Sequence, residues 1–258
     1  MVATLQTGLS SRQPSFPPLS RCVMCGANEA RPVLTVEKAP RHHFRPLAAA
    51  RRDADFGVLA IVRCGRCGHL YNRSFDDRQT EKLYSAKVLT NAPVSPGMTK
   101  GLEDIADSIL RRAKPRPTVL EVGGGNGDLS LLLSEQATVV HLVEPSEAVP
   151  TDRFAGTKVV FHKAMFPAPT LGEQRFDVVV CRQVLEHVPD PLQFLSAIRE
   201  SLATDGTAYI ELPSADYITV NASIIDFHYL HAHYYRRAAV MALFARAGLE
   251  VTEVVDVK

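Results

Sequence analysis

The sequence predicts an α/β fold, a Rossmann-like, doubly wound and mostly parallel sheet preceded by a small zinc-ribbon module. Three observations predict it. From residue 118 onward, apolar strand-like segments alternate with amphipathic helical segments, the order typical of a parallel sheet with crossover helices. A glycine-rich turn follows the first of these strands. Upstream of both, two Cys-x-x-Cys units lie within residues 22–67, in a spacing typical of a structural metal site.

The expected elements follow from hydrophobic period and from start and stop signals. An amphipathic helix over 99–113 is broken by the Pro-containing segment 114–117, which marks a boundary. Asp190 is a helix cap with Pro191 at the first helical position. Strands are expected at 118–122, 139–143, 159–162, 176–181, 207–212 and 250–257, and further helices at 128–136, from Pro191 onward, and up to Gly248.

These patterns divide the chain into four parts. Residues 1–20, rich in Ser, Thr and Pro, are expected to be a disordered leader, and residues 21–75 a zinc-binding module. Residues 76–117 are expected to form a connecting helical region, and residues 118–258 a Rossmann-like domain.

The composition argues against several classes of protein. A net charge of +1 over 258 residues gives no electrostatic footprint for nucleic acid or an anionic membrane, so neither is expected as a partner. There is no run of about 18 apolar residues for a membrane span. The N-terminus also lacks the charged start and apolar block of a secretory signal. A cytoplasmic enzyme is expected, and the oligomeric state stays open.

The glycine-rich turn contains Gly123, Gly125 and Gly127 and joins the first strand to its helix. Glycines let the backbone turn tightly and let a ligand approach the main chain, and the helix N-terminus offers free N–H groups. Asp128 stands where a nicotinamide-binding loop has its third glycine, which disfavours that class of cofactor.

An acidic residue, Glu144, ends the next strand, 21 residues after Gly123. A carboxylate there can accept hydrogen bonds from both hydroxyls of a ribose and would repel a phosphorylated ribose. The alternative is a simple glycine-rich turn next to a surface glutamate.

Three segments resemble the class I S-adenosylmethionine-dependent methyltransferases: VLEVGGGNGDL (119–129), HLVEPSE (141–147) and FDVVVCRQVLEHVPDP (176–191). The resemblance covers about residues 100–257 and implies S-adenosylmethionine as the cofactor. It implies that the glycine turn and Glu121 hold the methionine end and Glu144 the ribose, although Lys163 stands where the family commonly has Asp. The residues it assigns to the cofactor are Glu121, Gly123, Gly125, Gly127, Glu144, Pro145, Ala164, Met165, Arg182 and Gln183.

Each Cys-x-x-Cys unit is followed by glycine, at Cys22 and Cys25 and again at Cys64 and Cys67. Two such knuckles supply four sulfurs, which suits tetrahedral Zn²⁺ in a closed, structural site. The alternatives are two reduced pairs without metal, or a redox pair. Cys181, at the end of an apolar strand, is expected in the core.

The cysteine spacing, together with GHLYNRSF (68–75), resembles a narrower group, zinc-ribbon methyltransferases that include sugar C-methyltransferases acting on nucleotide-linked ketosugars. The segment DFHYLHAHYY (226–235) resembles that group's His-Glu-His-like segment, with Leu230 in place of its Glu. The resemblance weakly favours C-methylation over O- or N-methylation. The sequence differs in ending without the usual seventh strand.

Four residues are candidates for the catalytic step: His231, His228, His187 and Tyr84. Histidine suits a proton acceptor because its unperturbed pKa is near 6.5. The resemblance places His231 on the base of the sugar C-methyltransferases, with His228 or Tyr84 orienting the acceptor. For His187, in the loop after the fourth strand of the Rossmann-like domain, it favours a structural role or orientation of the methionine end over proton transfer. The alternative is that the histidines and tyrosines of 226–235 only pack together.

Two functions from different classes follow. The first is an S-adenosylmethionine-dependent methyltransferase acting on a small molecule. The second is a non-catalytic scaffold that binds zinc and cofactor within a larger assembly. Binding of S-adenosylhomocysteine and turnover of the methyl donor discriminate between them.

Overall fold

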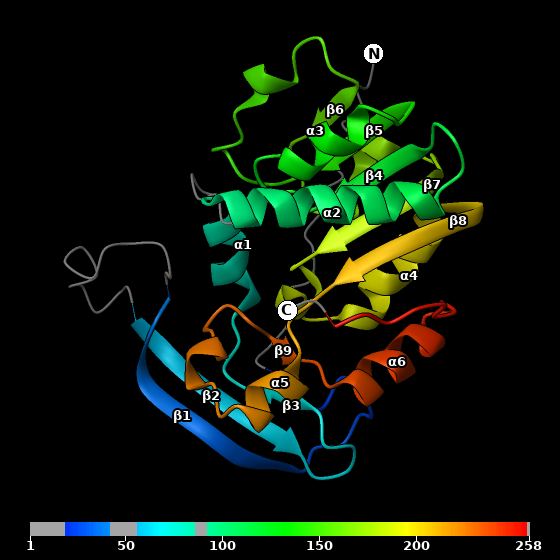
Figure 1. Ribbon diagram of the computed structural model, residues 1–258. Coiled ribbons are helices and arrows are strands. Elements are labelled where there is room, and N and C mark those ends of the chain that lie inside the picture. The colour runs from blue at the N-terminus through cyan, green and yellow to red at the C-terminus, as the bar shows by residue number, and fades with distance from the viewer. Residues whose placement is uncertain (1–18, 42–55, 86–91, 257–258) are drawn as a thin grey trace, which may run out of the picture.

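The computed structural model describes residues 19–41, 56–85 and 92–256, so the expected leader lies outside the described residues apart from its last two. Two sheets organise the chain (Figure 1). One is antiparallel in the order β1-β2-β3-β9, and the other is parallel in the order β6-β5-β4-β7-β8. This arrangement confirms the predicted fold class, a Rossmann-like parallel sheet with an antiparallel cysteine-bearing sheet upstream of it.

The parallel sheet contains the five strands predicted between residues 118 and 212. They are β4 (Thr118–Val122), β5 (Val139–Val143), β6 (Val159–His162), β7 (Phe176–Arg182) and β8 (Leu202–Glu211). The helices around them are α2 (Pro96–Arg112), α3 (Asp128–Ser134), α4 (Pro191–Ser201) and α6 (Arg237–Arg246). The predicted cap of α4 is confirmed, because Asp190 accepts a hydrogen bond of 3.0 Å from the Gln193 N–H and Pro191 takes the first helical position.

Two apolar clusters lie on the two faces of this sheet. Val119 and Leu120, neighbours in the central strand β4, point to opposite faces and are both completely buried. The cluster of Val119 includes Ile109 of α2 and Leu133 of α3, and the cluster of Leu120 includes residues of α4 and α6. Burial on both faces explains the unbroken apolar run of β7 from Val178 to Cys181, all of which are buried.

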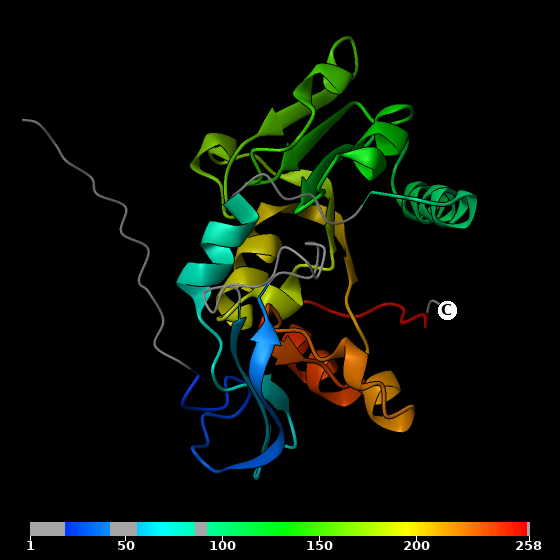
Figure 2. The same cartoon turned by 90° about the vertical axis from the view of Figure 1, so that its left-hand side faces the viewer.

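The antiparallel sheet consists of β1 (Ala30–Pro40), β2 (Phe56–Cys64), β3 (Leu70–Asn72) and β9 (His233–Tyr234). Its fourth strand comes from the far end of the chain, a pairing that no local sequence pattern indicated. The side view shows this sheet below the parallel one (Figure 2). Helix α1 (Asp77–Ser85) lies between the levels of the two sheets, and α5 (Ala215–Val220) lies at the lower right.

The last predicted strand, 250–257, is wrong, because residues 250–256 form no strand and residue 257 lies outside the described part. No strand among the described residues pairs with this segment to complete its backbone hydrogen bonds, and Val255 is 65% exposed. The segment instead makes two ion pairs, Arg112–Glu253 at 2.6 Å and Arg237–Asp256 at 3.8 Å.

Candidate functional site

A cavity of about 1090 Å³ opens at the carboxyl ends of the parallel strands, the edge at which α/β sheets bind ligands. Eleven of the residues predicted for cofactor and catalysis line this one cavity. They are Gly123, Gly125, Glu144, Pro145, Ala164, Met165 and Gln183, together with Tyr84, His187, His228 and His231. The other three, Glu121, Gly127 and Arg182, are not among the lining residues. The fold thus brings together residues that lie up to 147 positions apart, from Tyr84 to His231.

The glycine turn has the backbone that its sequence implies. Gly123, Gly125 and Gly127 all have positive φ, at 70°, 56° and 75°. A side chain at Gly123 would collide with Val184, and one at Gly127 would meet the Phe154 ring at 2.7 Å. Only glycine fits such positions without strain. Because glycine has no side chain, a ligand in the cavity could approach the main chain of the turn closely.

Glu144 lies at the end of β5 and is buried. One carboxylate oxygen accepts the Gly125 N–H at 3.0 Å and the other accepts the Ser146 N–H at 3.0 Å. Burial raises the pKa of Glu144, while these two hydrogen bonds lower it in part. Each oxygen keeps a further acceptor position, and the glycine turn holds the group in place.

Glu121 lies beneath the glycine turn. Its carboxylate accepts a hydrogen bond from the Ser130 hydroxyl, and a side chain at Gly124 would meet it at 2.6 Å. Burial raises the pKa of Glu121 to about 7. In this structure the residue supports the turn from below.

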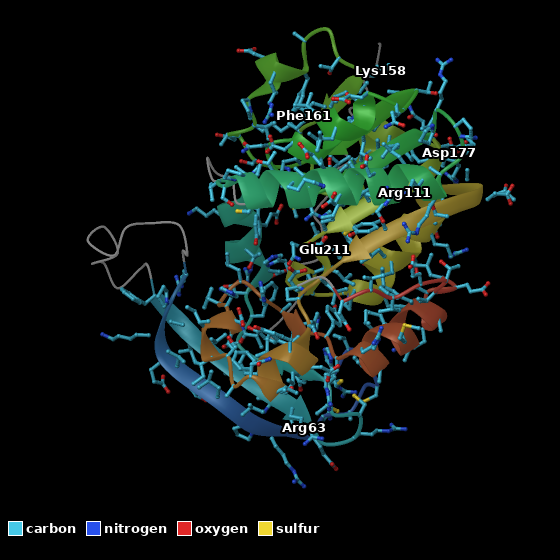
Figure 3. All side chains as sticks on the ribbon, viewed as in Figure 1. Arg63, Arg111, Lys158, Phe161, Asp177 and Glu211 are labelled. Carbon is cyan, nitrogen blue, oxygen red and sulfur yellow. The ribbon has the colours of Figure 1, made fainter. Side chains whose placement is uncertain are left out.

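Arg182 and Gln183, at the end of β7, share a partner that the sequence reasoning missed. The carboxylate of Glu211, which is labelled in Figure 3, accepts hydrogen bonds from Arg182 Nε at 2.9 Å and from Arg182 Nη2 at 3.2 Å. It also accepts the Gln183 side-chain N–H at 3.0 Å. Arg182 and Glu211 are register partners at the carboxyl ends of neighbouring parallel strands, the signal that could have found the pair.

The four catalytic candidates form one cluster. The ring centroids of His187 and His231 lie 4.8 Å apart, as do those of His228 and His231. The Tyr84 hydroxyl lies 3.1 Å from Nδ1 and 3.2 Å from Nε2 of His187. Burial lowers the pKa of His228, only partly offset by Asp226. The arrangement places three imidazoles and a phenol at one wall of the cavity.

Glu186 is a second residue whose importance sequence reasoning missed. It lines the cavity, is 2% exposed, and its Oε2 has no hydrogen-bond partner among the described residues. Its Oε1 lies 3.7 Å from His187 Nε2, and the polar atoms of Glu186, His187 and His231 lie within 4.8 Å of one another. Burial raises the pKa of Glu186 to about 8. The segment LEH was visible in the sequence, but its burial was not.

Replacing Glu186 by glutamine is expected to flatten the dependence of stability on pH. Because the folded-state pKa of about 8 lies above the ordinary value of 4.5, stability from the neutral carboxyl is complete below pH 4.5 and is lost as the pH rises to about 8. Chemical denaturation at pH 5 and pH 8 measures the difference, a few kcal/mol at about 1.4 kcal/mol per pH unit. Equal losses of stability in wild type and Glu186→Gln between these pH values would contradict the assignment.

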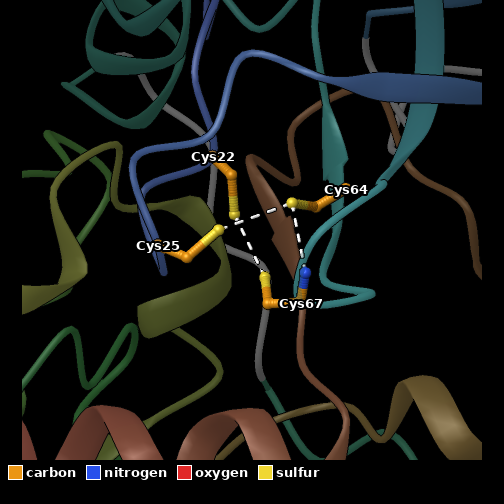
Figure 4. A group of neighbouring side chains, drawn as sticks. All are labelled: Cys22, Cys25, Cys64 and Cys67. Atoms are coloured by element: carbon orange, nitrogen blue, oxygen red, sulfur yellow. Dashed lines mark hydrogen bonds between the residues drawn. The ribbon is translucent and has the colours of Figure 1, made fainter.

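The four cysteines of the two knuckles meet in a second cluster (Figure 4). Sulfur–sulfur distances are 3.5 Å for Cys22–Cys67 and 3.5 Å for Cys25–Cys64. These distances are near the edge of about 3.8 Å for a tetrahedron with Zn–S bonds of about 2.3 Å. The two knuckles are alike, with Gly26 and Gly68 in the left-handed region at φ 74° and 75°. Cys181 is buried in β7, apart from this cluster.

Comparisons with known proteins bear on this geometry. Residues 98–254, more than half of the chain, match a family model described as "Methyltransferase domain". A ubiquinone biosynthesis O-methyltransferase of Aromatoleum aromaticum is 27% identical over 153 residues, covering 52% of this chain and 64% of the relative. One of Idiomarina loihiensis is 35% identical over 97 residues, covering 35% and 40%. In both relatives the match spans less than two thirds of their length.

A solved structure shares the fold. It is a chain from the complex between the Haloferax volcanii Trm112 methyltransferase activator and a methyltransferase, with a TM-score of 0.50 and 21% identity. The match covers 61% of this chain and 75% of that chain. Among the described residues, no helix has both the length and the apolar character needed to span a bilayer.

Proposed function

We propose that this chain, which belongs to the family of S-adenosylmethionine-dependent methyltransferases whose model matches residues 98–254, transfers a methyl group from that cofactor to a small-molecule acceptor. One observation carries the proposal. The glycine turn and Glu144 line the same cavity as the histidine cluster, so donor and acceptor have one shared space. Methyl transfer is an in-line displacement, and it requires the methyl group and nucleophile to be held close together.

The cofactor would lie along the glycine turn. Glu144, with an acceptor position left on each oxygen, suits the two ribose hydroxyls. Pro145, Ala164 and Met165 line the cavity beside it and suit the adenine. Gln183 would contact the methionine end, with Glu121 and the Arg182–Glu211 pair holding the loops beneath.

Replacing Glu144 by alanine is expected to weaken binding of S-adenosylhomocysteine by about 1–3 kcal/mol, the scale of hydrogen bonds to a charged group. Glu144→Gln is the matched control, because it keeps one acceptor oxygen, and its loss should be smaller. Isothermal titration calorimetry measures both. An unchanged affinity in Glu144→Ala would place the ribose elsewhere.

His231 is proposed to accept the proton that the nucleophile loses as the methyl group transfers. Its support is position: it lines the cavity, is buried, and contacts the rings of His187 and His228. Tyr84 and His228 would orient the acceptor. Glu186 lies beside His187, and protonation of the histidine cluster would favour ionisation of its carboxyl, which would then stabilise the positive charge.

Two acceptor atoms, carbon and oxygen, each have a specific observation in their favour. The four-cysteine sheet and the histidine segment support the sugar C-methyltransferase resemblance and a nucleotide-linked ketosugar. The names of the relatives matched over part of the chain support O-methylation. Release of S-adenosylhomocysteine measured with a hydroxylated aromatic compound and with a nucleoside-diphosphate-linked ketosugar separates the two.

The four cysteines are proposed to hold one structural Zn²⁺, since thiolates at these separations fit its tetrahedral coordination. The scaffold alternative shares this zinc and the cofactor but not the turnover. Wild-type protein that binds S-adenosylhomocysteine and releases no product from any acceptor of either class would favour the scaffold.

A further inference from the structure

The histidine segment is held from one side by the loop after β7. The Ala232 N–H donates to the Glu186 carbonyl oxygen at 2.7 Å, and Nδ1 of His187 lies 2.8 Å from the Leu230 carbonyl oxygen. Nε2 of His233 lies 3.3 Å from the Pro189 carbonyl oxygen. His187 and His231, which come from different parts of the chain, are therefore held together by one backbone hydrogen bond and by two contacts between a histidine ring and a backbone carbonyl.

The same segment is held from the other side by the cysteine-bearing sheet. β3 pairs with β9, and the Asn72 N–H donates to the Ala232 carbonyl oxygen at 2.9 Å. β3 begins three residues after Cys67, and the Cys64 N–H donates to the His69 carbonyl oxygen at 2.8 Å. The second cysteine knuckle is thus connected to His231 through one short strand.

A pair of buried histidines, His69 and His233, connects the segment before β3 with β9. His69 is 0% and His233 is 1% exposed, and Nε2 of His69 lies 3.2 Å from Nδ1 of His233. The Pro189 carbonyl can only accept, so Nε2 of His233 carries the proton and Nδ1 is the acceptor. Nε2 of His69 must then donate, which leaves its Nδ1 as the bare nitrogen, and that atom has no hydrogen-bond partner among the described residues.

We propose that His69 is a positioning residue, and that through its hydrogen bond to His233 the four-cysteine sheet sets the place of His231 and His187 against the acceptor. The four-cysteine sheet then supports the active-site wall from behind, although none of the residues of β1, β2 or β3 lines the cavity. A buried N–H···N bond favours one arrangement of the two strands, because any other leaves polar atoms unpaired. The role in catalysis rests on the proposed function, whereas the link between sheet and segment does not.

Two substitutions of the same chemical kind test the link. Glutamine at position 69 places its amide N–H where Nε2 of the ring lies, and asparagine, one carbon shorter, places it near Nδ1. His69→Gln should keep the donor and His69→Asn should lose it. Hydrogen–deuterium exchange of peptides covering 228–235 and 185–189, followed by mass spectrometry, reads the segment directly without an acceptor.

We expect His69→Asn to reduce protection of both peptides about tenfold while His69→Gln retains it. Peptides from β4 and β5 serve as internal controls, and affinity for S-adenosylhomocysteine should stay within twofold in both variants. Removal of metal from the wild type with a chelator should reproduce the asparagine result. With any acceptor that turns over, His69→Asn should lower kcat or raise KM for the acceptor, with the glutamine variant restoring the wild-type value.

Equal protection in the two variants, or equal loss across the whole chain, would overturn the proposal. So would full protection of 228–235 after metal removal. Failure of the proposed function has a different signature, because a protein that binds no S-adenosylhomocysteine can still show the local difference in exchange. If both variants fail to fold by circular dichroism, the loss of the glutamine rescue also counts against it.

Discussion

His231→Ala is expected to lower the rate of methyl transfer by roughly 10²–10⁴-fold, the usual contribution of a general base. The residue is buried at the cavity wall, and its ring centroid lies 4.8 Å from that of His187 and 4.8 Å from that of His228. Alanine removes the proton acceptor and leaves the glycine turn and Glu144 unchanged, so affinity for S-adenosylhomocysteine should stay near the wild-type value. Single-turnover methyl transfer and calorimetry measure the two quantities.

A matched control exists in His162→Ala, because His162 lies in β6 and is not among the residues that line the cavity. That variant should retain its turnover rate even if it is less stable. Full activity of His231→Ala from pH 6 to pH 9 would rule out the role of proton acceptor, because methyl transfer would then not depend on this imidazole.

Cys25→Ser is expected to reduce bound zinc from one ion per chain to well below one and to unfold the antiparallel sheet locally. Structural zinc in small domains contributes apparent free energies of about 10–16 kcal/mol, and a hydroxyl is a poor replacement for a thiolate ligand. Elemental analysis measures the metal, and limited proteolysis measures the exposure of residues 56–75. Binding of S-adenosylhomocysteine should change little, because the cofactor site is built on the parallel sheet.

Cys181→Ala is the control for this experiment. Cys181 is the fifth cysteine and is buried in β7, apart from the four-cysteine cluster. It should lose some stability through the removed side chain and keep its zinc. Wild-type protein that contains no zinc after purification without chelators would contradict the assignment of the cluster.

Much of the fold could be predicted because local rules set it. The alternation of apolar strands and amphipathic helices, the cap at Asp190 and the spacing of the two cysteine knuckles are each encoded within a few residues. The positive φ angles of Gly123 and Gly127 follow in the same way, since only glycine adopts them without strain. Such features do not depend on what the segment later packs against.

The tertiary structure alone decided the rest. Residues 250–256 form no strand because no strand in the described part of the chain pairs with them, whereas β9 is a strand because β3 lies beside it. Glu186 became a buried carboxyl through its surroundings, and His69 met His233 across 164 positions of sequence. Hydrogen-bond pairing and burial depend on which distant segments are brought together, so the sequence by itself determined the elements and the loops, and packing determined which polar groups share the site.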